Sequence, residues 1–315
     1  MDRIGPFSSA GTAQLRSKRA SVRRTILLIR LMLFTASVPA MFAARAEAAE
    51  VVIVGDTQLK LVAEVVSGIR KTLRGSISSY SPAEVRGTLP RIVAKEQPRI
   101  VIALGRDALS EALNLPVAIP VIYGFILTPP VINRPNTTGI YMAAPVREYA
   151  DLVKKHLHSI KNVAVIGSRD QLDILAVDSP SRWGSYSVKN GAELVGTLKG
   201  LDKTDAILLL PNASLLTPSA LEEAYLLSFR KGIPLLGISE KQVRDGALLA
   251  LVVDLAGLGR MIGEYASAVS SGTPIERLPP APANRFELYL NRETARKMGI
   301  PIPAELMKAA KRISP

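Results

Sequence analysis

The sequence has no cysteine, two histidines and one tryptophan among its 315 residues, and aromatic residues make up 5% of it. Without cysteine, the chain forms no disulfide bond and carries no lipid attached through a cysteine. His156 and His158 stand beside Lys154, Lys155 and Lys161, where we expect the solvated basic face of a helix. A zinc site is therefore not expected, and the sequence predicts no metal and no cofactor.

Several motifs of hydrolytic and nucleotide-binding enzymes are also missing. The sequence contains no G-x-S-x-G nucleophile elbow. Residues 257–263 lie inside a helical pattern and miss the dinucleotide spacing, and residues 191–197 have the glycine spacing of a phosphate loop without its lysine. We interpret 191–197 as a turn into a strand. We expect no enzyme activity, although a hydrolytic alternative stays open in which Asp56 and Asp107 activate water.

The first 48 residues have the pattern of a secretory signal peptide. Residues 1–24 hold six Lys/Arg against one acidic residue, and an apolar stretch follows at 25–44. Small residues near the end of this segment match the pattern that a signal peptidase reads, so we expect a mature chain that begins near Ala49 and resides in the periplasm. Two alternatives stay open, namely twin-arginine export and a retained membrane helix, which the interruption at Arg30 argues against.

The formal net charge of +13 overstates the basicity of the working protein. The predicted signal peptide contains eight of the 40 Lys/Arg and two of the 27 Asp/Glu, which leaves +7 for the remaining 267 residues. This excess is spread along helical patterns, and few aromatic rings are available to stack on bases, so we expect no nucleic-acid partner. A chain of this length suffices for one large domain or two ordinary lobes.

Short apolar runs alternate with helical patterns along most of the mature chain. Val62, Val65, Val66, Ile69 and Leu73 recur at the spacing that places one apolar stripe on a helix. The apolar runs do not alternate with polar residues, which is typical of strands covered on both faces. The pattern predicts an α/β fold with parallel sheets and right-handed crossovers. The strand-like runs are 51–54, 100–104, 117–125, 163–167, 206–210 and 248–253.

Two regions rich in proline interrupt this alternation, at 127–139 and 271–285. We interpret the first as the end of a lobe and the second as a return connection. The sequence therefore predicts two Rossmann-like lobes joined by a hinge that the chain crosses more than once. We expect the first lobe to comprise 49–142 and about 255–282, and the second to comprise 143–254 and about 283–315.

Small polar groups follow several predicted strands, where ligands of open α/β sheets bind. Free backbone N–H groups at the start of a helix favour a carboxylate or phosphate, and Arg106 could clamp such an anion. Helix capping is the alternative, and it needs no ligand. The candidates for ligand binding are Asp56, Thr57 and Gln58, then Gly105 and Arg106, then Asn212 and Ser214, and finally Asp254.

Aromatic residues on either side of the first proline-rich region form a second group of candidates. Tyr123, Phe125 and Tyr141 could stack on a flat ligand. The sequence leaves open the alternative that these rings pack in the core beside a hinge.

Two stretches near the C-terminus carry recognisable motifs, at 232–266 (GIPLLGISEKQVRDGALLALVVDLAGLGRMIGEYA) and 285–313 (RFELYLNRETARKMGIPIPAELMKAAKRI). The first contains a Val-x-x-Gly-Ala-Leu turn and an Asp followed by Leu-Gly-Arg. The second contains Asn, Thr-Ala, Met, Gly and two prolines in order. Together they resemble the ABC transporter substrate-binding protein family with a type I periplasmic binding fold. The matching residues are Val243, Gly246, Ala247, Leu248, Asp254, Leu258, Gly259, Arg260, Asn291, Thr294, Ala295, Met298, Gly299, Pro301 and Pro303.

The resemblance implies an exported, monomeric two-lobe protein that closes on a small solute and presents its closed form to an ABC permease. An amino acid or a related carboxylate is the solute that we expect. In this hypothesis Arg106 and the N–H groups after Gly105 hold the anion, and Tyr123 or Phe125 contacts the side chain. By the match of position, the resemblance implies ligand contacts at Thr57, Gln58, Arg106, Tyr123, Asn212 and Glu240, with Asn212 and Glu240 binding an amine.

The chain departs from the family near the expected ligand site. Relatives commonly place two aromatics after the aspartate, whereas Leu255 and Ala256 follow Asp254 here. The usual Asp-Pro after the fourth strand is replaced by residues 127–130 (LTPP). These departures leave open a different function, a ligand-sensing receptor for a membrane partner without transport.

Overall fold

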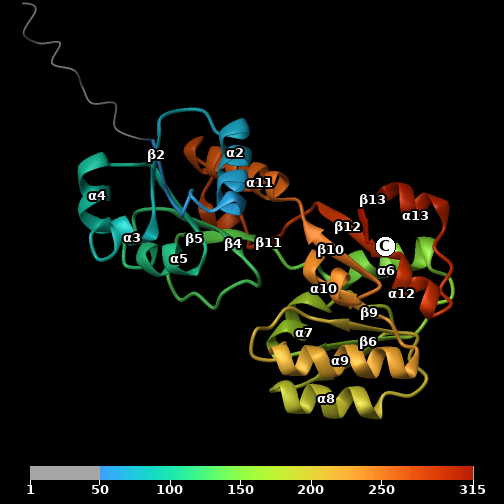
Figure 1. Cartoon of the computed structure of the whole chain (residues 1–315). Coiled ribbons are helices and arrows are strands. Elements are labelled where there is room, and N and C mark those ends of the chain that lie inside the picture. Colours follow the sequence, from blue (N-terminus) through green and yellow to red (C-terminus); the bar gives the residue numbers. More distant parts are fainter. Residues whose placement is uncertain (1–49, 315) are drawn as a thin grey trace, which may run out of the picture. The chain divides into compact units, whose positions relative to one another are not determined.

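The computed structural model describes residues 50–314, and the predicted signal peptide lies outside the described residues. Helices and strands alternate along the chain, and the strands form two sheets (Figure 1). The first sheet has the strand order β11-β5-β4-β3-β1-β2, and every neighbouring pair in it is parallel. Its strands are β1 (Val51–Val54), β2 (Ile77–Tyr80), β3 (Ile100–Leu104), β4 (Val121–Ile126), β5 (Thr137–Tyr141) and β11 (Ala281–Pro282).

Helices cover both faces of the first sheet, as its continuous apolar strands require. Val51 and Ile53 of β1 belong to a core cluster under α2 (Lys60–Thr72) and α11 (Leu255–Ser270). Val52 and Val54 point to the opposite face, because successive side chains of a strand alternate. The helices on that second face are α3 (Pro82–Val85), α4 (Leu89–Glu96) and α5 (Arg106–Ala112).

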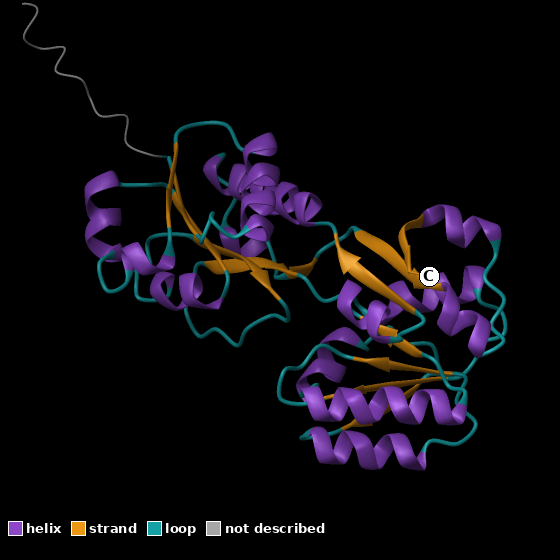
Figure 2. Ribbon diagram, viewed as in Figure 1, coloured by secondary structure: helices purple, strands orange, loops and turns teal. Residues whose placement is uncertain are grey.

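The second sheet has the strand order β13-β12-β10-β9-β8-β6-β7. Its strands pair in parallel except that β10 and β12 are antiparallel. Helices lie on both sides of this sheet (Figure 2). Its strands are β6 (Val163–Gly167), β7 (Gly184–Ser187), β8 (Ala206–Leu209), β9 (Leu235–Gly237), β10 (Leu249–Val253), β12 (Phe286–Asn291) and β13 (Ala310–Ser314). The chain also forms α6 (Val146–His156), α7 (Arg169–Leu175), α8 (Gly191–Gly200), α9 (Pro218–Lys231), α10 (Glu240–Asp245), η2 (Ile275–Arg277), α12 (Arg292–Lys297) and α13 (Ala304–Ala309).

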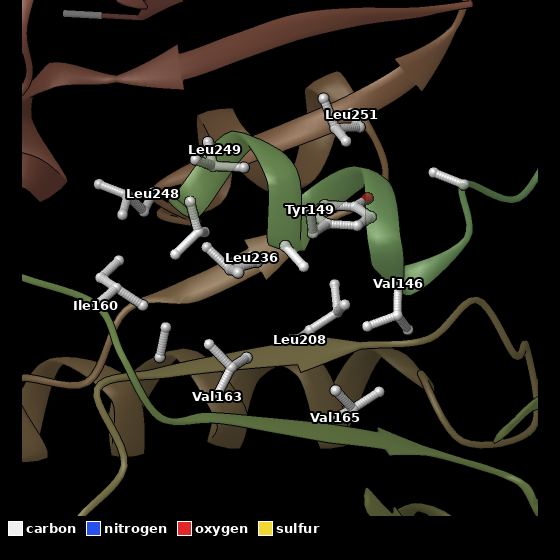
Figure 3. Close-up of a cluster of buried hydrophobic side chains, with 14 of the residues drawn as sticks. Val146, Tyr149, Ile160, Val163, Val165, Leu208, Leu236, Leu248, Leu249 and Leu251 are labelled. Carbon is white, nitrogen blue, oxygen red and sulfur yellow. The ribbon is translucent and has the colours of Figure 1, made fainter. Parts of the chain in front are cut away.

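Tyr149 of α6 anchors one face of the second sheet. Its ring is 1% exposed and lies over Leu208 and Leu236 (Figure 3). The buried hydroxyl donates a hydrogen bond of 2.9 Å to the backbone oxygen of Gly237, which satisfies a polar group that would otherwise be costly to bury. The opposite face of the sheet packs against α8 and α9. The second sheet is thus buried on both sides, like the first.

The polypeptide passes between the two sheets three times. It leaves the first sheet after β5, returns after β10 to form α11 and β11, and leaves again before β12. The predicted α/β class, with two mostly parallel sheets and more than one connection between them, is confirmed.

Two details of the sequence interpretation are wrong. Residues 191–197 begin helix α8 and are not a turn into a strand, because the side chain of Asn190 accepts a hydrogen bond of 2.9 Å from the backbone N–H of Glu193 and caps a helix. β4 begins at Val121 and not at residue 117. The preceding residues form a turn in which the N–H of Ile119 donates to the oxygen of Pro116 at 3.0 Å.

Among residues 50–314, no helix is both long enough and apolar enough to cross a membrane.

Helices α2 and α11 approach each other closely because glycines lie at their contact (Figure 1). The Cα of Gly68 lies 2.9 Å from the position that a Cβ of Gly259 would take, and such a Cβ would also overlap the backbone oxygen of Val65. A Cβ on Gly263 would overlap the hydroxyl of Thr72. That hydroxyl donates to the backbone oxygen of Arg260 at 3.3 Å. Backbone therefore packs on backbone where α11 returns to the first sheet.

Replacing Gly259 by alanine should destabilise the protein by about 1–3 kcal/mol, since overpacking at a backbone contact forces the helices apart. Thermal or urea unfolding measures the change. Gly196→Ala in α8 is the control, because no atom lies within 4 Å of its added Cβ and alanine favours a helix by about 0.5–1 kcal/mol. Equal stability of the two variants would contradict the packing argument.

Candidate functional site

Loops that follow β1, β2 and β3 border a cavity of about 580 Å³, which we call the loop cavity. Parallel strands end at the same edge of a sheet, so residues far apart in the sequence meet there. The loop cavity brings together several of the candidates predicted from the sequence. These are Asp56, Gln58, Gly105, Arg106 and Phe125.

Local turns give the loop cavity its shape. Oδ1 of Asp56 accepts a hydrogen bond of 3.1 Å from the backbone N–H of Gln58, which closes the turn after β1 and leaves Thr57 exposed. Gly105 precedes α5 with φ of 96°, a conformation that favours glycine. The charges around this cavity balance, so it has no net preference for an anion. They are Asp56, Asp107, Arg86 and Arg106.

A second cavity, of about 350 Å³, is lined by elements of both sheets. We call it the carboxylate cavity, because Glu64 of α2, Glu240 of α10 and Glu287 of β12 border it. Lys311 of β13 is the basic residue among its lining. The rest of the wall is largely apolar and includes Leu61, Leu127, Met142, Ile238 and Leu255, together with the rings of Phe125 and Tyr289.

Phe125 lines both cavities and has an unusual backbone. Its φ is 55°, in the left-handed region that a bulky side chain rarely adopts. The pairing of β4 with β5 changes register between Tyr123 and Ile126, so Phe125 lies at a bulge. Bulges re-aim side chains and are frequent beside functional sites. The bulge thus directs the half-buried ring of Phe125 toward the two cavities.

Tyr123 and Tyr141 lie in the core and line neither cavity. Tyr123 is 1% exposed and packs in the cluster on the α5 side of the first sheet. Burial raises the pKa of Tyr123 to about 12 and also raises the pKa of Tyr141 above its ordinary value. Their position corresponds to the core-packing alternative that the sequence left open.

Asn212 and Ser214 bond to each other at the end of β8. Oδ1 of Asn212 accepts from the backbone N–H of Ser214 at 3.0 Å and from its hydroxyl at 2.6 Å. Neither residue lines the loop cavity or the carboxylate cavity, although the adjacent Pro211 lines the second. The pair therefore forms a local turn beside the carboxylate cavity.

Asp254 is the N-cap of α11. Its Oδ1 accepts from the backbone N–H of Gly257 at 2.9 Å, and its Oδ2 lies 3.2 Å from Nη2 of Arg260. Both residues belong to the Asp and Leu-Gly-Arg motif seen in the sequence. In this structure the motif starts the helix that carries the glycine contact with α2.

Glu64, Glu287, Tyr289 and Lys311 are cavity residues that the sequence reasoning missed. Period-2 alternation in residues 286–291 would have revealed part of this set, because it places Glu287 and Tyr289 on one face of a strand. No sequence signal relates Glu64 to them, since β12 lies more than 200 residues further along the chain.

Within residues 50–314, no three histidine, cysteine, aspartate or glutamate side chains are grouped so that they could hold a metal ion.

The α/β architecture with two mostly parallel sheets corresponds to a type I periplasmic binding fold. Residues 183–314 match the family model described as ABC transporter substrate binding protein. This range contains both stretches whose motifs indicate that family, so the resemblance is confirmed. No curated protein sequence matches the chain.

Solved structures of low sequence identity share the fold. A ligand-free, open substrate-binding protein with adhesive properties from Clostridium difficile is 16% identical, with a TM-score of 0.62, and the match covers 84% of this chain and 98% of that one. An ABC domain in complex with L-Trp from Streptococcus pneumoniae is 18% identical, with a TM-score of 0.53, and the match covers 84% and 99%. A conserved domain protein from Vibrio cholerae is 18% identical, with a TM-score of 0.53, and the match covers 85% of this chain and 100% of that one.

Asp254→Ala should lower the stability of the protein by about 1 kcal/mol, because it removes a helix cap. Asp254→Asn should cost less, since an amide oxygen can still accept the N–H of Gly257. Urea unfolding compares the two. If both variants kept wild-type stability and lost solute binding, the capping role would be wrong and a ligand role for Asp254 would replace it.

Proposed function

We propose that the chain is an exported solute-binding protein of an ABC transporter, which captures a small organic solute by hinge closure and does no catalysis. The observation that carries this proposal is the carboxylate cavity, whose wall includes residues of both sheets. A solute held there contacts two parts of the chain that are joined by three connections. Its binding energy favours the arrangement in which both parts touch it.

The proposed lobes follow the two sheets. The first comprises residues 49–142 and about 255–282, and the second comprises 143–254 and about 283–315. A closed form of these lobes would be recognised by an ABC permease in the inner membrane, and the binding protein would act as a monomer. The family match over residues 183–314 supports this partner. Export to the periplasm is supported by the basic and apolar pattern of residues 1–48.

The strained backbone of Phe125 supports a ligand role for its ring. Residues in sparsely populated backbone conformations cost about 1–3 kcal/mol and cluster at ligand clamps. Phe125 adopts such a conformation at the junction of the two cavities. Its ring is apolar and rigid, so it would contact the apolar part of a solute at little entropic cost.

A thermal-shift screen of amino acids, amines, small acids and nucleosides tests the proposal. A micromolar solute at a hundredfold excess over its Kd stabilises the native state by about 2.7 kcal/mol, which corresponds to a Tm rise of about 5–10 °C for a chain of this size. If no small solute in such a screen raises the Tm, the proposed function is wrong.

Phe125→Gly should abolish most of this ligand-induced shift and yet leave the unliganded protein more stable than Phe125→Ala. Glycine adopts a positive φ without strain, whereas alanine keeps the strain and removes the ring. Tm values with and without solute separate the two effects. Phe229→Ala on α9 is the control, because that ring is 40% exposed and lines neither cavity. A full ligand-induced shift in Phe125→Gly would contradict the role of the ring.

A further inference from the structure

The charged groups of the carboxylate cavity are mostly engaged with one another. Nζ of Lys311 lies 2.5 Å from Oε1 of Glu287. Nη1 of Arg312 lies 2.5 Å from Oε1 of Glu240, and Nη1 of Arg244 lies 3.4 Å from the same oxygen. The cationic groups near this cavity are therefore already bound to carboxylates of the protein.

One carboxylate, that of Glu64, remains unpaired after these pairings. Glu64 has no ion pair within 4 Å among residues 50–314, and it is an exposed residue of α2 that lines the cavity. Oε2 of Glu240 accepts no hydrogen bond from any group in the described part of the chain, since both arginines bind Oε1. Glu64 is thus the carboxylate of the lining that can receive an ammonium N–H without competition from a cationic side chain bound to it.

No free cation in the lining offers a matching site for a solute carboxylate. Lys311 is paired with Glu287, and the hydrogen bond between them raises the pKa of Lys311, which keeps this lysine positively charged. Arg106, which the sequence hypothesis assigns to an anion, lines the loop cavity and not this one. An added carboxylate would meet the unpaired charge of Glu64 and no free cation in a partly apolar enclosure, where like charges repel more strongly than in water.

The remaining wall suits an apolar body. Leu61, Met142, Ile238 and Leu255 line it together with the rings of Phe125 and Tyr289. Aromatic faces attract a cation as well as apolar groups. An ammonium group on a hydrophobic skeleton would therefore satisfy both parts of the lining.

We infer that the carboxylate cavity selects an apolar amine of net charge +1, with its ammonium bound by Glu64, and that a carboxylate on the solute weakens binding. The inference rests on the proposed function and names the class of its solute. It differs from the hypothesis that the sequence suggested, an amino acid or carboxylate held by Arg106.

Three probes with one aromatic body and different charges test the inference on the purified protein. They are 2-phenylethylamine (cation), L-phenylalanine (zwitterion) and 3-phenylpropionate (anion). We expect calorimetry to give 2-phenylethylamine a Kd at least about tenfold below that of phenylalanine, a difference of about 1.4 kcal/mol, and to detect no binding of 3-phenylpropionate. Binding of 3-phenylpropionate or phenylalanine as tight as that of the amine overturns the inference.

Absence of any binding by 2-phenylethylamine also overturns the inference. That result leaves the proposed function standing if another solute of the wider screen raises the Tm. Only the failure of every solute removes the proposed function, so the two failures are distinguishable.

The variant Glu64→Gln tests whether Glu64 is the residue that causes the preference for an amine. Removing the charge of this unpaired carboxylate should raise the Kd of 2-phenylethylamine by about tenfold, because a hydrogen bond to a charged group is stronger than one to a neutral amide. It should change the Kd of phenylalanine less. Glu264→Gln is the matched control, since Glu264 is an exposed glutamate of α11 that lines neither cavity. Equal weakening by both variants would mean that only the overall charge matters, and the assignment to Glu64 would be wrong.

Discussion

The close contact of α2 with α11 is the constraint on which the arrangement of this protein depends. Residues 255–282 come after most of the second sheet, yet they must pack on the first. Glycines at 68 and 259 let the two helix backbones meet, and hydrophobic side chains around them complete the core. α11 begins at the Asp254 cap directly after β10, a strand of the second sheet, and packs with α2 on the first sheet. The contact between α2 and α11 therefore connects the two sheets.

The two cavities follow from the same connectivity. Parallel strands bring the loops after β1 and β3 to one edge of the first sheet, which creates the loop cavity. The crossings of the chain bring β10, β12 and β13 near α2, which creates the carboxylate cavity. Phe125 lines both cavities. It lies at a bulge where the regular pairing of β4 with β5 is interrupted, and its backbone there has a positive φ. Ion pairs from the C-terminal strand then set the charge that a solute would meet.

The sequence predicted the loops that border the loop cavity, but it did not predict which residues line the carboxylate cavity. Asp56, Gln58, Gly105 and Arg106 were named because they follow strands, and they share a cavity with Phe125, which was named as an aromatic residue that could stack on a ligand. Tyr123 was also named as such an aromatic residue, yet it lies in the core, since neighbouring residues of a strand face opposite sides and a bulge changes which side each takes. A ligand role for these residues stays a prediction.

The sequence by itself determined the α/β alternation, the covered faces of the strands and the helical stripe of α2, because burial and backbone geometry impose periods that are readable along the chain. Its motifs also indicated the family that residues 183–314 match. Only the tertiary structure decided that Glu64, Glu240 and Glu287 border one cavity and that Lys311 and Arg312 neutralise two of them. The physical reason is that such contacts join residues remote in the chain, and electrostatic pairing depends on distances in space that no local pattern records.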